Sequence, residues 1–125
     1  MPRAQRQPDP DALLPLRPVM FAALLALSQE PRHGYAIMQY VNQHGGGSKI
    51  LGPGTLYRTL KEMRDLSLVE QTSYDTDDSA ADERRHYYQL TPFGRKVMTA
   101  EATRLATLLR GAKLGRLLPR SGSER

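Results

Sequence analysis

Residues 48–70, SKILGPGTLYRTLKEMRDLSLVE, decide the fold, because a helix pattern in them gives way to a strand pattern. Pro53 and Gly54 are typical of a helix start. Leu56, Leu60 and Met63 recur at helical spacing and predict one buried face, while the opposite side presents Tyr57, Arg58 and Lys61. An apolar inner face with an aromatic and two cations outside suits a helix that enters the major groove of DNA, which is roughly 12 Å wide.

Two further helices are predicted before this stretch. Pro18 opens the apolar run VMFAALLAL, which has no polar face and should be buried nearly all round. Pro31 forbids its continuation beyond about Gln29. A shorter helix follows over residues 33–44, and the glycines at 45–47 end it.

A β-hairpin is predicted after the central stretch. Residues 68–74 (LVEQTSY) and 84–91 (RRHYYQLT) are short and rich in Val, Thr and Tyr, and a polar segment separates them. The order helix, helix, helix, hairpin predicts a winged helix-turn-helix. The fold class is therefore mainly α with a small β-hairpin (α+β).

A last helix is predicted from Thr91, a good N-cap, and Pro92, a good first residue, to about Gly111 or Gly115. It carries an apolar seam with spacings of four and three, namely Met98, Ala102, Leu105, Leu109 and Ala112. Such a seam buries one helix on another, so we expect a dimerisation helix. The alternative is that the seam packs on the chain's own first helix.

The domain organisation expected is a disordered arm (1–11), a winged helix-turn-helix (12–91), a dimerisation helix (92–115) and a disordered tail (116–125).

The chain has no cysteine, which excludes disulfides, thiolate nucleophiles and cysteine-based zinc sites. Its three histidines match no metal-ligand spacing, and we expect no metal and no cofactor. No apolar run is long enough to cross a bilayer, so a cytoplasmic protein without membrane contact is expected.

Four short motifs resemble the PadR family in order and spacing: HGYAI (33–37), GTLYRTLKEM (54–63), LVE (68–70) and RHYYQLTPFGR (85–95). The resemblance covers roughly residues 13–112. It implies a DNA-binding transcriptional regulator of the short subfamily, which dimerises through a single C-terminal helix. It also implies DNA contacts for Thr55 and Tyr57, a wing cation at Arg85, and inward packing of Tyr88 and Leu90.

Two residues depart from the family pattern. Arg58 stands where the family usually has proline, which adds a cation to the groove face. Ser67 stands where it usually has glycine. If that position needs a positive φ, serine costs about 1 kcal/mol there.

The expected function is a dimeric repressor, and the net charge of +5 suits a polyanionic partner. The partners are double-stranded DNA with a near-palindromic operator, a second copy of the chain, and a small effector molecule suggested by the resemblance. The residues expected to contact DNA are Lys49, Thr55, Tyr57, Arg58, Lys61, Arg84 and Arg85.

Five carboxylates in residues 75–83 would be repelled by phosphates, and they keep a second hypothesis open. That hypothesis is a winged helix that binds a protein partner and has no specific DNA binding. An enzyme is not expected, because the chain offers no thiol, no glycine-rich phosphate loop and no Ser-His-Asp order.

Overall fold

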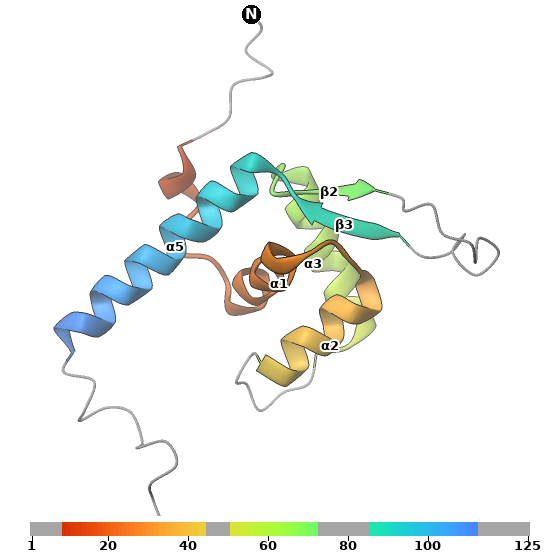
Figure 1. Cartoon of the computed structure of the whole chain (residues 1–125), viewed down its shortest axis with the longest axis horizontal. Coiled ribbons are helices and arrows are strands. Elements are labelled where there is room, and N and C mark those ends of the chain that lie inside the picture. The colour runs from red at the N-terminus through yellow and green to blue at the C-terminus, as the bar shows by residue number, and fades with distance from the viewer. Residues whose placement is uncertain (1–8, 45–50, 73–85, 113–125) are drawn as a thin grey trace, which may run out of the picture.

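The computed structural model describes residues 9–44, 51–72 and 86–112. Its elements, in chain order, are a 3-10 helix η2 (Pro10–Leu13), α1 (Pro18–Gln29), β1 (Arg32–His33), α2 (Gly34–His44), α3 (Pro53–Asp65), β2 (Val69–Thr72), β3 (Tyr87–Leu90) and α5 (Pro92–Gly111). Figure 1 shows α1 at the centre of the molecule, with α2, α3, α5 and the sheet around it. None of the helices in these described ranges is long and apolar enough to cross a membrane.

Helix α1 forms the centre of the core, as its unbroken apolar sequence predicted. None of its residues from 19 to 28 is exposed, and the helix packs against α2, α3, α5 and β3. Pro18 occupies the first helical position and Glu30 is already extended. The hydrophobic effect of burying this helix on several sides is therefore the main force that joins the other elements.

The sheet has three antiparallel strands in the order β1-β3-β2. The hairpin pairs Val69 with Leu90 and Thr72 with Tyr87, so β2 begins one residue later and β3 ends one residue earlier than the sequence pattern suggested. The predicted strand residues 73–74 and 84–85 lie outside the described part. Strand β1 was not anticipated, and it adds Arg32 opposite Tyr88. Tyr88 is buried and Leu90 packs against the core, as the resemblance implied.

Helix α3 ends in a Schellman motif centred on Ser67. The Leu68 amide donates to the Met63 carbonyl and the Ser67 amide donates to the Arg64 carbonyl, each at 2.9 Å. Ser67 has a φ of 65°, in the left-handed region that favours glycine. The conformational cost foreseen for a serine at this position is therefore present in the fold.

Replacing Ser67 by glycine should raise the free energy of unfolding by about 0.5–1 kcal/mol. The gain is the relief of the left-handed strain, reduced by the extra freedom of glycine in the unfolded chain. Urea denaturation of the wild type and Ser67→Gly measures it, with Ser67→Ala as the control that keeps a Cβ atom and should bring no gain. An unchanged or lower stability of Ser67→Gly would contradict the strain assigned to this turn.

Thr91 joins the start of α5 to this turn. Its hydroxyl accepts a hydrogen bond from the Gly94 amide at 2.8 Å and donates toward the Ser67 carbonyl at 2.6 Å. Its own amide donates to the Leu68 carbonyl at 3.1 Å. The predicted start of the last helix at Thr91 and Pro92 is confirmed, and the helix ends at Gly111, the nearer of the two expected ends.

The N-terminal segment contributes more to the fold than the arm expected over residues 1–11. Residues 1–8 lie outside the described part, but Asp9 caps η2 and Pro10 begins it. Helix η2 packs against α5, and Leu13 and Leu14 contact the core. From Asp9 onward the segment is therefore part of the fold. The tail expected over 116–125 also lies outside the described residues.

Candidate nucleic-acid interface

Helix α3 presents one buried face and one exposed face. Leu56, Leu60 and Met63 are buried, which confirms the inward stripe predicted from their spacing. The helix starts at Pro53 after Gly52, and no side chain caps its first turn. The first backbone N–H groups of such a helix favour anions, phosphates among them.

The exposed face brings together the described residues expected to contact DNA, namely Thr55, Tyr57, Arg58 and Lys61. Tyr57 keeps 51% of its surface exposed although it is a large aromatic residue. The other expected contacts, Lys49, Arg84 and Arg85, lie outside the described residues. One face of one helix therefore holds an aromatic ring, two cations and a hydroxyl.

Tyr57 rests on the first residue of α2. A Cβ atom on Gly34 would lie 2.5 Å from the Tyr57 hydroxyl oxygen and 2.9 Å from the ring carbon that bears it. Only glycine at position 34 allows this approach. The glycine of the His-Gly-Tyr motif thus lets α2 support the Tyr57 ring from one side while its other side faces solvent.

The cations of this face differ in their partners. Lys61 Nζ lies 3.1 Å from Asp65 Oδ2, one turn further along the helix. The Arg58 Nη2 atom instead donates to the neutral Thr55 hydroxyl at 3.2 Å. Asp65 is itself exposed, so the positive charge of the face is partly balanced.

Arg17, at the start of α1, forms a bidentate pair with Glu62 of α3. The two nitrogen–oxygen distances are 2.8 and 3.2 Å. The hydrogen bond from Arg17 holds the pKa of the Glu62 carboxyl below its ordinary value. This pair joins the start of α1 to α3. It also neutralises the Glu62 carboxylate, which would otherwise repel a phosphate.

Three residues near this face, Asn42, Arg64 and Tyr35, were not singled out from the sequence. Asn42 of α2 accepts a hydrogen bond from the Leu51 amide at 2.7 Å and donates to the Leu51 carbonyl at 3.2 Å, so it holds the chain just before α3. Arg64 and Tyr35 are exposed, and Tyr35 follows the glycine that supports Tyr57. Exposed polar and aromatic residues on helices carry no pattern that separates such roles from ordinary surface.

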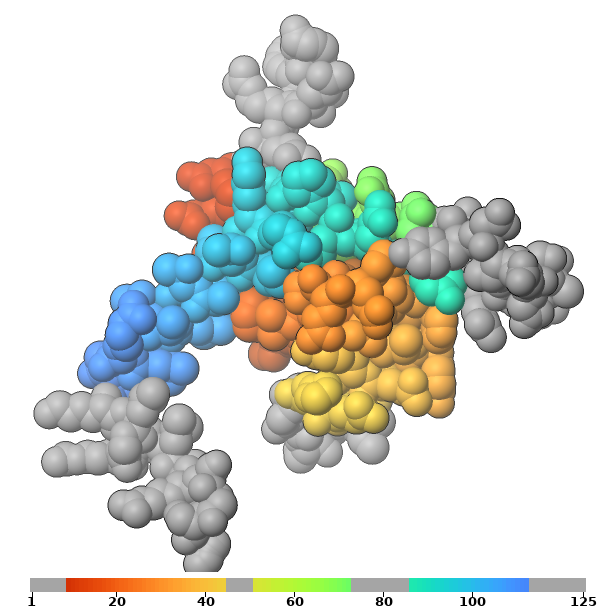
Figure 2. Space-filling model, viewed as in Figure 1, coloured from red at the N-terminus to blue at the C-terminus, as the bar shows by residue number. Residues whose placement is uncertain are grey.

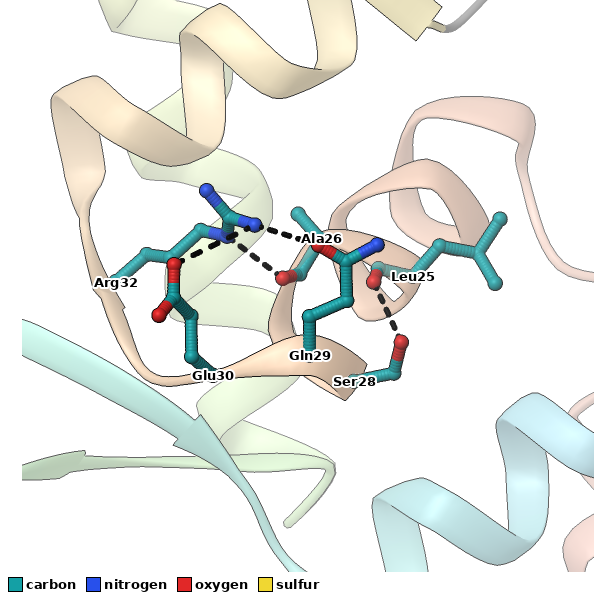
Figure 3. A network of polar contacts seen from close by, with 6 residues as sticks. All are labelled: Leu25, Ala26, Ser28, Gln29, Glu30 and Arg32. Carbon is teal, nitrogen blue, oxygen red and sulfur yellow. Dashed lines mark hydrogen bonds and ion pairs between the residues drawn. The ribbon is translucent and has the colours of Figure 1, made fainter.

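The Arg32 side chain forms hydrogen bonds with the C-terminal end of α1 (Figure 3). Its Nε donates to the Ala26 carbonyl at 2.7 Å and its Nη2 to Gln29 Oε1 at 2.9 Å. Its guanidinium also lies 5.2 Å from the centre of the Tyr40 ring. A cation on the free carbonyls of a helix C-terminus stabilises that end, so Arg32 has a structural role.

The seam predicted on the last helix divides in two. Met98 keeps only 9% of its surface exposed and belongs to the chain's own core, so it is not available to a partner. Further along, Ala102 and Leu109 are exposed, and Leu105 and Ala112 are half-buried. Leu108, which the seam did not include, is 59% exposed. Figure 2 shows the last turns of α5 projecting beyond the other described elements.

Several known proteins that resemble this chain are transcriptional regulators with a similar fold. The model of the transcriptional regulator PadR-like family matches residues 23–100. The structure of a PadR family transcription regulator from Clostridium difficile is similar with a TM-score of 0.61 and 23% identity, over 74% of this chain and 95% of that chain. The transcriptional regulator BldR from Sulfolobus solfataricus is similar with a TM-score of 0.62 and 20% identity, over 82% of this chain and 64% of that one. These structural likenesses show a shared winged-helix fold.

An uncharacterised 37.1 kDa protein in a transposon of Streptomyces fradiae is 35% identical over 85 residues. That alignment covers 68% of this chain, and the chain spans 22% of the length of that protein.

Proposed function

Because this chain belongs to the PadR-like family of transcriptional regulators, we propose that it is a homodimeric repressor whose α3 binds the major groove of a near-palindromic operator. The family is one of regulators rather than enzymes. The observation that carries the proposal is the exposed face of α3, which presents Thr55, Tyr57, Arg58 and Lys61 on a helix whose first turn has no side-chain cap.

The chemistry of this face suits a DNA duplex. In helix-turn-helix proteins the second helix lies in the major groove and its N-terminal residues meet base edges. Thr55, Tyr57 and Arg58 occupy the first two turns of α3, and Lys61 lies about one turn further along the helix. In that position Lys61 would contact the DNA backbone. Lys49, Arg84 and Arg85 would add phosphate contacts, which position a protein on DNA without reading its sequence.

Dimerisation through α5 is the second part of the proposal. Leu105, Leu108 and Leu109 form an apolar patch at spacings of three and one, and Leu108 and Leu109 are 59% and 44% exposed. Burying such a patch on a second copy removes apolar surface from water. Two recognition helices related by a two-fold axis would then reach half-sites roughly 34 Å apart.

A small effector that relieves repression completes the proposed cycle, bound where the two subunits meet. We place the protein in the cytoplasm, where it can reach chromosomal DNA. The effector would have to favour one arrangement of the two subunits over the other in order to change DNA affinity.

Fluorescence anisotropy tests the proposal directly. The purified full chain is titrated into labelled duplex DNA from upstream of its own gene and into a scrambled duplex, at several salt concentrations. The expected result is selective binding to the upstream duplex, with affinity that falls steeply as salt rises because phosphate contacts release counterions. Absence of binding even at low salt would remove the DNA-binding function and favour the protein-partner hypothesis.

Replacing Tyr57 by alanine should weaken specific DNA binding by about 1–3 kcal/mol, because a half-exposed ring on the groove face is lost. The fold should remain, since the ring covers Gly34 without being part of the core. Anisotropy gives the affinity and thermal unfolding gives the stability. Gln39→Ala, on the exposed side of α2, is the control that should leave both unchanged. Loss of the fold in Tyr57→Ala would instead make Tyr57 a packing residue.

A further inference from the structure

Arg58 extends its guanidinium over the first turn of α3. Its Nη2 atom donates to Thr55 Oγ1, three residues earlier, at 3.2 Å. A Cβ atom on Gly54 would lie 3.7 Å from the Arg58 Nη1 atom. The two nitrogen arms therefore spread toward the N-terminal end of the helix, as expected for a side chain whose Cα–Cβ bond tilts that way.

The direction of the Arg58 side chain matters because that end of the helix is the one that reads bases. In helix-turn-helix proteins the N-terminal residues of the recognition helix contact base edges. Arg64 is also an exposed cation of α3, but it lies in the last turn of the helix. Of the cations on this helix, Arg58 is thus the best placed for a base edge.

The hydrogen-bond partner of Arg58 is uncharged, unlike the partners of Lys61 and Arg17. Lys61 is paired with Asp65, and Arg17 is paired with Glu62. Among the described residues, Arg58 forms no ion pair with a carboxylate, and its hydrogen bond goes to a neutral hydroxyl. Binding a new acceptor therefore breaks no ion pair, and the Thr55 contact restricts the side chain beforehand, which lowers the entropy lost on binding.

We propose that Arg58 reads a guanine in each half-site of the operator, through hydrogen bonds to the O6 and N7 atoms of that base. The planar guanidinium presents parallel donors, and guanine is the base that shows two adjacent acceptors in the major groove. This assignment rests on the proposed function, since it needs α3 in the groove. Beyond the proposed function, the assignment names one base of the operator half-site and the residue that selects that base.

A contact from Arg58 to a phosphate is the alternative, and the two differ in what they select. A base contact sets a preference at one position. Loss of a phosphate contact lowers the affinity for all DNA sequences alike. It also makes the affinity depend less steeply on salt concentration.

Selection of binding sites from a randomised duplex library tests the assignment, with the full chain as wild type, Arg58→Ala, Arg58→Gln and the control Arg110→Gln. Arg110 is an exposed arginine at the far end of α5. The wild type and the control should enrich the same two-fold motif with one guanine per half-site. Arg58→Ala should lose that guanine preference by about 5- to 150-fold while the rest of the motif remains.

Arg58→Gln should move the preference toward adenine, because a glutamine amide pairs with adenine N6 and N7. An Arg58→Ala variant that enriches the unchanged motif with the guanine intact would overturn the assignment while leaving the proposed function in place. A uniform loss of affinity with the same base frequencies would also overturn it, in favour of a phosphate contact. If the wild type enriches no motif, both the assignment and the proposed function fail.

Discussion

Replacing Gly94 by alanine is expected to destabilise the fold by about 3–4 kcal/mol, near the upper end of what a single added methyl group does. Gly94 lies in the first turn of α5, directly against the backbone of Leu68. A Cβ atom there would overlap the Leu68 carbonyl oxygen and lie 2.9 Å from its carbonyl carbon. Neither atom is the end of a flexible side chain, so the backbones themselves would have to separate.

Separation would break the contacts that join α5 to the end of α3. The Leu68 carbonyl accepts the Thr91 amide at 3.1 Å, and the Thr91 hydroxyl reaches the Ser67 carbonyl at 2.6 Å. Urea denaturation of Gly94→Ala measures the loss. Gly111→Ala is the matched control, because a Cβ atom there meets nothing within 4 Å, and it should be neutral or slightly stabilising. Equal stability of Gly94→Ala and wild type would contradict the close packing of these two backbones.

The second large effect is expected at Glu101, a carboxylate that is only 2% exposed. It accepts hydrogen bonds from Arg104 Nε at 2.6 Å and Nη2 at 2.9 Å, and from the Leu16 amide at 3.1 Å. It thereby joins α5 to the segment that precedes α1. Glu101→Ala should lower the free energy of unfolding by about 3–5 kcal/mol, because a buried donor loses its acceptor and a cavity remains.

The same carboxylate should make stability depend on pH. The hydrogen bonds from Arg104 are the largest reason that the pKa of Glu101 lies below its ordinary value of 4.5. A group with a lowered pKa in the folded state contributes its full stabilisation above that ordinary value and loses it as the pH falls through the folded pKa. Wild type should therefore lose stability below about pH 4.5 more steeply than Glu101→Gln, which has no proton to bind.

Unfolding free energies of these two proteins between about pH 3 and pH 7 give the difference directly. The other carboxylates are common to both proteins and cancel in it. Parallel curves would show that Glu101 has the same pKa in the folded and unfolded states, contrary to its burial and its three hydrogen bonds.

The parts of the fold that were predictable are those with a periodic pattern or a strong local signal. The stripe of Leu56, Leu60 and Met63 gave the buried face of α3, and Thr91 with Pro92 gave the start of α5. Strand β1 has two residues, too few for any periodicity, and its pairing with β3 is a tertiary contact. Helix η2 is equally short and depends on packing against α5.

Glu101 was missed for a different reason. A glutamate and an arginine three residues apart on a helix ordinarily form an exposed pair of small effect. Here the carboxylate is buried because the chain before α1 crosses α5 and its Leu16 amide needs an acceptor. Only the three-dimensional path of that segment separates this pair from a surface one.

The exposed face of α3 was largely predictable, because the exposed residues of a helix follow from the positions of its buried ones. Its supports were not. Gly34 and Tyr57, which lie close together, are 23 positions apart in the sequence. Asn42 and Leu51, which share two hydrogen bonds, are nine positions apart. No sequence pattern links the members of either pair. The position of Met98 in the core, rather than at a subunit interface, likewise depends on how α5 crosses the molecule.

The most direct test of the central claim, that the exposed face of α3 meets DNA, is a map of backbone amide chemical shifts in 15N-labelled protein titrated with its operator duplex. We expect the largest changes at Gly54, Thr55, Arg58 and Lys61, with Gln39 and Gln43 on the outer side of α2 nearly unchanged. Changes concentrated at Gln39 and Gln43, with α3 unaffected, would contradict that claim.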